Sequence, residues 1–287
     1  MKNILSLFTL ATFAAIPLAQ GSVFVADFTG LASGDPLLGF DNWTQSESNP
    51  GTDYLAWGML VGGNKGFGLG PAIGLPAYSV LSVSHPIDNI GLLGGPVATT
   101  VQTTFAIADS TASWPARNDY SIGIFNGAGD RLFSLDIVAQ DQVVPGGSND
   151  KWNMYWSTGV TTNTPSFGAI YEDNPDPNGA LYKMSVTFAT IPATNDVAFT
   201  LSVTGNNTFS TTGTLTGLDT EEIAEYRVTT SIASGIVVYD EFAEPIDPAV
   251  DWGDGFIAIS GVSVPEPSSF MLLGLSALGL MRRRRCA

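Results

Sequence analysis

The sequence predicts an all-β protein whose main part is an antiparallel β-sandwich with one short helix. Three observations support this fold class. Apolar and polar residues alternate with a period of two along most of the chain, which is typical of half-buried strands. The 32 glycines and 17 prolines fall largely between these runs, where turns are expected. The alternating runs are numerous and short, which favours two packed sheets.

Two alternating runs carry the clearest strand signal. Residues 182–189 and 197–204 place apolar side chains at every second position, and a loop rich in turn residues joins them. Residues 120–125 and 132–138 flank a Gly-containing turn and predict a hairpin. The other predicted strands cover residues 23–28, 54–61, 78–83, 97–108, 152–157, 209–215, 226–238 and 256–264.

The short helix is predicted over residues 220–226. Asp219 is placed to cap its first turn. Glu222 follows three residues later and completes the pattern of a capping box.

The first 21 residues have the composition of a secretory signal peptide. Lys2 gives a positive start, residues 4–18 form a nearly continuous apolar run, and residues 19–21 (Ala-Gln-Gly) form a small-x-small cleavage pattern. We expect an apolar helix that directs the chain to the Sec export machinery. The cut is expected between residues 19 and 22, so residues 1–21 are left out of the fold.

Residues 264–287 contain three chemically different segments in a fixed order. Pro265, Glu266 and Pro267 come first, and the prolines keep this motif extended. Residues 270–281 form an apolar run of 12, a helix too short for a stable span, which needs roughly 20 apolar residues. A positively charged block ends the chain and should stay on the cytoplasmic side. This membrane stop consists of Arg282, Arg283, Arg284 and Arg285.

This order resembles the PEP-CTERM sorting signal of Gram-negative bacteria that make exopolysaccharide. In that family a membrane protease, an exosortase, recognises the Pro-Glu-Pro motif and removes the tail. The resemblance implies transient anchoring in the inner membrane, followed by delivery to the outer envelope or the extracellular matrix. It implies nothing about the activity of the remaining residues. Cys286 lies outside the family pattern, and it is either inert or a site of palmitoylation.

Residues 22–263 form the expected sandwich domain between the two signals. The opening V-F-V-A-D-F of residues 23–28 and the closing G-F-I-A-I-S-G-V-S-V of residues 255–264 resemble the first and last strands of concanavalin A-like jelly rolls. This resemblance implies a jelly-roll topology whose terminal strands lie near each other. The domain contains no cysteine, and its length allows a core of ordinary size without disulfides.

The charge of the chain excludes nucleic acid as a partner. Only six basic residues lie between residues 20 and 264, whereas 26 of the 27 acidic residues do. Phosphate binding needs clustered Lys and Arg. Cations, neutral glycans such as exopolysaccharide, or no ligand at all remain as partners. Acidity that keeps an exported protein soluble is the simpler explanation.

The sequence contains no clear catalytic motif. The one histidine, His85, precedes a proline at a strand end without a nucleophile motif, which favours a structural role. Glu172 and Asp173 are adjacent and would point to opposite faces of a strand, whereas a retaining glycosidase needs two carboxyl groups about 5 Å apart. Asp27 and Asp136 lie within apolar strands, and edge or turn placement also accounts for them. We expect a protein without enzymatic activity.

The region around residue 176 resembles the first half of a calcium loop. Asn174, Asp176 and Asn178 place side-chain oxygens at alternate positions before a glycine. The closing Glu is missing, because Ser185 occupies its position. A turn rich in Pro and Asn is the favoured interpretation. We therefore expect no cofactor, with calcium as the alternative.

Aromatic residues give the carbohydrate-binding signal of this chain. Flat rings stack on sugars, while nearby polar groups bind the hydroxyls. Alternation places Trp152 and Trp156 on one face of a strand and Tyr155 on the other, and Trp114 lies in a polar loop. These four residues are the candidate carbohydrate-binding residues. The alternative position for Trp152 and Trp156 is the core, which we favour for at least one of them.

The sequence favours a non-enzymatic, exported structural or matrix component. A carbohydrate-binding, lectin-like module is the first alternative and requires exposed aromatic side chains. A glycoside hydrolase of concanavalin A-like fold is the second, and it requires a cleft with two facing carboxyl groups.

Overall fold

A computed structural model describes most of the region between the two predicted signals. No helix occurs among the described residues, and none there is long and apolar enough to cross a membrane. The predicted signal-peptide helix and the predicted helix of residues 270–281 lie outside them. The described residues are 22–47, 56–70, 80–87, 92–95, 98–108, 118–139, 151–159, 161–162, 165–171, 181–205, 207–232 and 256–265.

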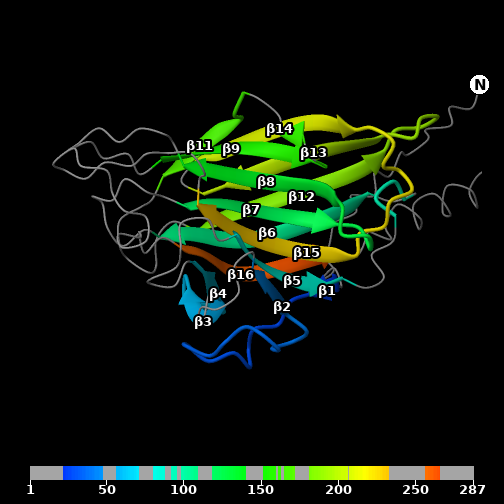
Figure 1. The fold of residues 1–287 in the computed structure, drawn as a ribbon. Coiled ribbons are helices and arrows are strands. Elements are labelled where there is room, and N and C mark those ends of the chain that lie inside the picture. The colour runs from blue at the N-terminus through cyan, green and yellow to red at the C-terminus, as the bar shows by residue number, and fades with distance from the viewer. Residues whose placement is uncertain are drawn as a thin grey trace, which may run out of the picture. The chain divides into compact units, whose positions relative to one another are not determined.

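The strands form two antiparallel sheets, here named sheet A and sheet B (Figure 1). In sheet A, β1 pairs with β16 beside the main path of strands. The main path of sheet A runs through β14 (Thr208–Leu215), β13 (Val197–Thr204), β12 (Tyr182–Thr190), β6 (Thr99–Ala108), β16 (Phe256–Pro265), β4 (Asn64–Leu69) and β3 (Ala56–Val61), and β1 is Ser22–Val25.

Sheet B has the same number of strands, and its β11 pairs with β9 beside the main path. Its neighbours come from distant parts of the chain, since β15 lies between β7 and β5. The main path runs through β10 (Thr161–Thr162), β9 (Lys151–Thr158), β8 (Arg131–Ala139), β7 (Asn118–Phe125), β15 (Glu225–Ile232), β5 (Val80–Pro86) and β2 (Thr44–Glu47), and β11 is Gly168–Tyr171.

Aromatic side chains join the two sheets. Phe133 of β8 contacts Phe188 of β12 and Phe199 of β13, with ring centroids 5.6 and 5.0 Å apart. All three side chains are buried, and they come from both sheets. A second aromatic group links Trp43, which precedes β2, to Phe67 of β4 at 4.9 Å. These contacts confirm the predicted antiparallel β-sandwich.

The chain's first and last described strands lie side by side. β1 pairs with β16 in the register Val25↔Ser263 and Phe24↔Val264, with an irregularity before Ser22↔Pro265. The proximity of terminal strands that the concanavalin A-like resemblance implied is therefore present. Both strands contribute to sheet A.

The predicted helix over residues 220–226 is wrong. Glu222 forms an isolated antiparallel bridge with Leu92, and the Glu221 carbonyl accepts a hydrogen bond from the Leu93 N–H at 2.7 Å. The Ala224 N–H donates to the Phe125 carbonyl at 2.9 Å, and β15 begins at the next residue. A short helix gains little by itself because its first turn is costly to nucleate. The hydrogen bonds with Leu93 and Phe125 instead hold the backbone of this segment in an extended conformation.

We predict that Phe133→Ala lowers the free energy of unfolding by about 3–5 kcal/mol, because it removes a ring that contacts both sheets and leaves a cavity. Urea unfolding of the exported protein measures the change. Thr200→Ala, at an exposed position of β13, is the control and should stay within about 0.5 kcal/mol of wild type. A loss for Phe133→Ala no larger than that of the control would contradict the role of this contact.

Candidate functional site

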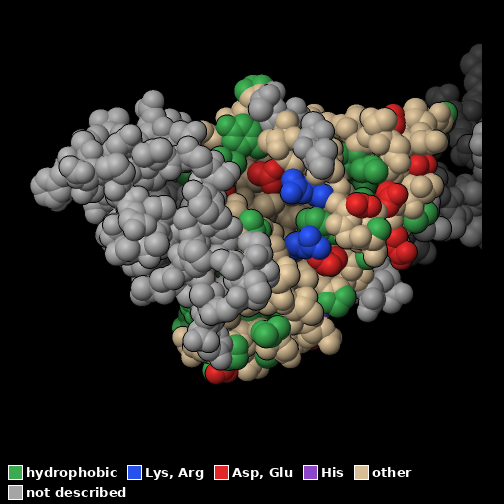
Figure 2. All heavy atoms as spheres, in the orientation of Figure 1, with side chains coloured by type: hydrophobic (Ala, Val, Ile, Leu, Met, Phe, Trp, Pro, Cys, Tyr) green, Lys and Arg blue, Asp and Glu red, His purple; other side chains and the backbone are tan. Residues whose placement is uncertain are grey.

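The face of sheet B that points away from sheet A carries a row of polar residues. Alternation sends Tyr226 and Val228 of β15 into the core, so Arg227 between them points outward. The register of the neighbouring strands on both sides places one residue of each strand level with Arg227. The resulting polar row consists of Thr44, Ser84, Arg227, Ser134 and Ser157, with Gly123 between Arg227 and Ser134. Figure 2, in the orientation of Figure 1, shows basic side chains on the visible face with acidic side chains beside them.

Asp136 of β8 accepts hydrogen bonds from three serine hydroxyls on this face. The Ser121 and Ser134 hydroxyls each donate to Asp136 Oδ1 at 2.8 Å, and the Ser157 hydroxyl donates to Oδ2. The Arg131 Nη1 lies 3.9 Å from Oδ2. Only 14% of the Asp136 side chain is exposed, and Ser134 and Ser157 are fully buried. These bonds satisfy a carboxylate that would otherwise be costly to bury.

Glu225 and Arg227 of β15 form the second charged feature of the face. The Arg227 Nε and Nη2 both lie 2.6 Å from Glu225 Oε1. The Arg227 guanidinium also lies 3.9 Å from the centre of the Phe125 ring, a cation–π distance. The two side chains are about a quarter exposed. Glu225 is therefore held by its own strand neighbour and does not act as an isolated acid.

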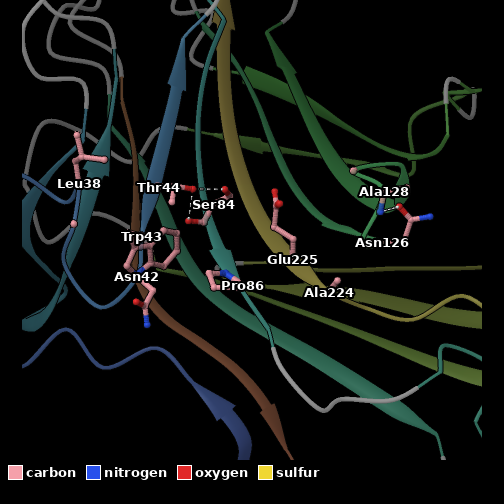
Figure 3. Close-up of a pocket in the computed structure, with 13 residues that line it drawn as sticks. Leu38, Asn42, Trp43, Thr44, Ser84, Pro86, Asn126, Ala128, Ala224 and Glu225 are labelled. Carbon is pink, nitrogen blue, oxygen red and sulfur yellow. Dashed lines mark hydrogen bonds between the residues drawn. The ribbon is translucent and has the colours of Figure 1, made fainter.

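A groove of about 900 Å³ lies at the end of this face. Thr44, Ser84 and Glu225 come to it from β2, β5 and β15, and residues 126–129 come from the β7–β8 turn (Figure 3). The full lining is Leu38, Gly39, Asn42, Trp43, Thr44, Ser84, Pro86, Asn126, Gly127, Ala128, Gly129, Ala224 and Glu225. The lining thus combines hydroxyl, amide and carboxylate groups with an indole ring and aliphatic carbons.

The polar groups of the groove are held in place by short contacts. The Thr44 and Ser84 hydroxyls lie 2.9 Å apart. The Asn126 amide nitrogen donates to Glu221 at 2.9 Å, while its oxygen accepts the N–H groups of Ala128 and Asp130. The groove is therefore built on ordered side chains from four separate segments.

Three of the four candidate carbohydrate-binding aromatic residues lie among the described residues. Trp152 is 1% exposed and part of the core, so its ring is not available to a sugar. Trp156 shares its face, as predicted, but that face points inward, and its ring packs against Phe199 at 4.7 Å. Tyr155 on the opposite face is half-buried. The core position of Trp152 is the one that the sequence favoured for at least one of the two tryptophans, because period-two alternation shows which residues share a face and not which face is covered.

Several predicted site residues lie outside the described residues. They are Trp114, the calcium candidates Asn174, Asp176 and Asn178, the motif residues Glu266 and Pro267, and Arg282, Arg283, Arg284 and Arg285. No cluster of metal-ligating side chains occurs among the residues that are described. Pro265 is described as the last residue of β16.

Among the residues that the structure describes, two ionisable groups have clearly shifted pKa values. The backbone N–H of Thr29 donates to Asp27 at 2.8 Å and lowers the pKa of this carboxyl. Asp27 thus belongs to an exposed turn after β1, as its turn interpretation predicted. Burial raises the pKa of the Tyr226 phenol far above its ordinary value, and the hydrogen bond from the Thr103 hydroxyl at 3.1 Å partly opposes this rise. The phenol therefore stays neutral in the core.

The C-terminal segment is identified by comparison with protein families. Pro265 ends β16, and the residues around and after it match a family model over 263–285. They form a PEP-CTERM protein-sorting motif. The PEP-CTERM resemblance seen in the sequence is thereby confirmed. The motif implies export, processing by an exosortase and sorting to the cell envelope.

Comparison with curated proteins finds no match. Among solved structures, the chain is similar to an endo-1,3-β-glucanase from Streptomyces sioyaensis, with 14% identity over 88% of this chain and 98% of that one and a TM-score of 0.49. It is also similar to the carbohydrate recognition domain of Emp46p in metal-free form (11% identity, 86% and 98% coverage, TM-score 0.46) and to lectin UEA-II complexed with galactose (7%, 85% and 99%, 0.42).

We predict that Asp136→Ala lowers the free energy of unfolding by about 1–3 kcal/mol, because buried serine hydroxyls lose their acceptor. Urea unfolding again provides the measurement. Asp130→Asn, in the exposed β7–β8 turn, is the control and should change stability by less than about 0.5 kcal/mol. If both variants unfold alike, Asp136 does not organise this face.

Proposed function

We propose that the chain is an exported, non-enzymatic β-sandwich protein that its PEP-CTERM motif delivers to the outer envelope or the exopolysaccharide matrix, where it is a structural component. The observation that carries this proposal is the junction between domain and motif. The family match begins at Ser263, inside β16, and Pro265 is the last residue of that strand. We therefore interpret residues 22–263 as the domain that is delivered, and the residues after it as the signal that directs its sorting.

The carboxylates of the outer face of sheet B support a function without hydrolysis. A glycosidase needs one carboxyl group that can give up a proton and a second about 5–9.5 Å away. Among the described residues that line the groove, Glu225 is the one carboxylate, and Arg227 holds it in an ion pair. Asp136 is engaged by three hydroxyls. The contacts of both carboxylates thus stabilise the outer face of sheet B.

A second candidate function is the binding of neutral saccharide in the groove. The Thr44–Ser84 hydroxyl pair can exchange hydrogen bonds with sugar hydroxyls, and the exposed side chains of Leu38 and Pro86 supply apolar surface. A neutral ligand suits a chain of net charge −16, which repels anionic polymers. The groove takes the place of the tryptophan face that the sequence suggested.

We predict that Glu266→Ala leaves the protein in the inner membrane with its C-terminal tail intact, because the motif that the exosortase recognises is lost. The wild-type protein should appear in the outer envelope or the medium without residues 270–287. Cell fractionation followed by mass spectrometry of each fraction measures both results. Glu222→Ala, an exposed glutamate of the domain, is the matched control and should be processed like wild type. Secreted wild-type protein with an intact tail would overturn the proposal.

We predict that Ser84→Ala weakens the binding of purified exopolysaccharide from the same organism by roughly tenfold, because one hydrogen-bonding group leaves the groove. Isothermal titration calorimetry measures the affinity. Ser82→Ala is a close control, since Ser82 lies on the same face of β5 and bonds to Thr229 outside the groove. Equal affinities for the two variants, or no binding by wild type, would exclude this second function.

A further inference from the structure

The end of β16 has fewer partners than its middle. On one side, pairing with β6 continues only to Ser263↔Gln102. On the other side, β4 pairs with Ile257 to Ile259, and β1 takes over from there. Among the described strands, β1 is therefore the one partner of Val264 and Pro265. The residue that opens the sorting motif is ordered by the N-terminal strand.

The two predicted processing signals border paired residues of sheet A. Ser22, the residue at the predicted signal-peptide cut, is the register partner of Pro265. Neighbouring strands of a sheet lie about 4.8 Å apart. The predicted signal-peptide cut and the first residue of the Pro-Glu-Pro motif therefore lie on adjacent strand ends.

We propose that β1 acts as a clasp on the sorting motif: its pairing with β16 controls the access of the processing protease to the start of the motif. This inference rests on the proposed function, because it assumes that the tail is removed. Removal hydrolyses one peptide bond, with water adding across it to give a new carboxylate on the domain and a new amine on the tail.

The physical basis is competition for the same backbone groups. A protease binds residues on both sides of the bond that it cuts, in an extended form free of other strands. Val262 and Val264 are buried, and the Ala26 N–H donates to the Val262 carbonyl at 3.0 Å. The β1 strand must therefore separate from β16 before these residues become available. When opening is fast, cleavage follows the population of the open form.

The register shows where a disulfide bond could hold β1 against β16. Because Ala26 and Val262 form a hydrogen-bonding pair, alternation makes Val25 and Ser263 a non-hydrogen-bonding pair, with Cα atoms about 4.5 Å apart. That separation suits a disulfide, and Val25 is 56% exposed. The Val25→Cys/Ser263→Cys variant, with Cys286→Ser to remove the native thiol, can therefore be closed by oxidation.

We predict that the oxidised double-cysteine variant loses its tail roughly tenfold more slowly than the same protein kept reduced, because locked β1 cannot open. Pulse-labelling in cells that contain the exosortase, with mass spectrometry of the product, measures the rate on the full chain. The Cys286→Ser single variant controls for the loss of the native thiol. Equal rates for the oxidised and reduced forms would overturn the clasp.

Two proline variants test whether weaker pairing between β1 and β16 speeds up removal of the tail. Alternation makes Phe24 and Val264 the next hydrogen-bonding pair, so Phe24→Pro removes a donor to β16, whereas Val25→Pro removes an N–H that points away from it. Tail removal should be faster for Phe24→Pro than for Val25→Pro, and equal rates would contradict the clasp. If wild type keeps its tail, the proposed function fails. If wild type is processed and none of these changes alters the rate, the clasp alone fails.

Discussion

Aromatic packing between the sheets is the interaction on which the rest of the structure depends. Phe133 of sheet B reaches both Phe188 and Phe199 of sheet A, and the inward positions of the neighbouring strands are apolar for the same reason. Strand alternation then leaves the outward positions to small and polar residues. The polar row of sheet B, with Asp136 beside it, is thus a consequence of how the core is filled.

Strands with a clear alternation could be predicted from the sequence almost to the residue. The runs 182–189 and 197–204 correspond to β12 and β13, because the alternation that marks them also buries one face of each. β2 and β4 were not predicted, since β2 reads Thr-Gln-Ser-Glu and β4 contains two glycines. Both are strands because their partners supply the pairing. The helix prediction over 220–226 failed for the same reason, since backbone partners from other segments outweighed a local capping pattern.

The candidate site could be predicted less well than the fold. The sequence singled out Asp136 as a carboxylate within an apolar strand, but its donors Ser121 and Ser157 become neighbours only through the register of β7, β8 and β9. The groove is assembled from four segments, around residues 38–44, 84–86, 126–129 and 224–225. No local pattern links them. The sorting motif is the opposite case, because all of its chemistry lies in one continuous segment.

The position of β16 also has a consequence for the time at which the domain can fold. This last described strand lies inside sheet A, between β6 and β4, and its partner β6 comes from a distant part of the sequence, as in the pair Phe256↔Ala108. A chain that passes through a narrow export channel must be unfolded during passage. Because sheet A lacks an internal strand until residues 256–265 emerge, its closure waits for those residues, and pairing at such long range is slow. The topology therefore keeps sheet A open until its last described strand is available.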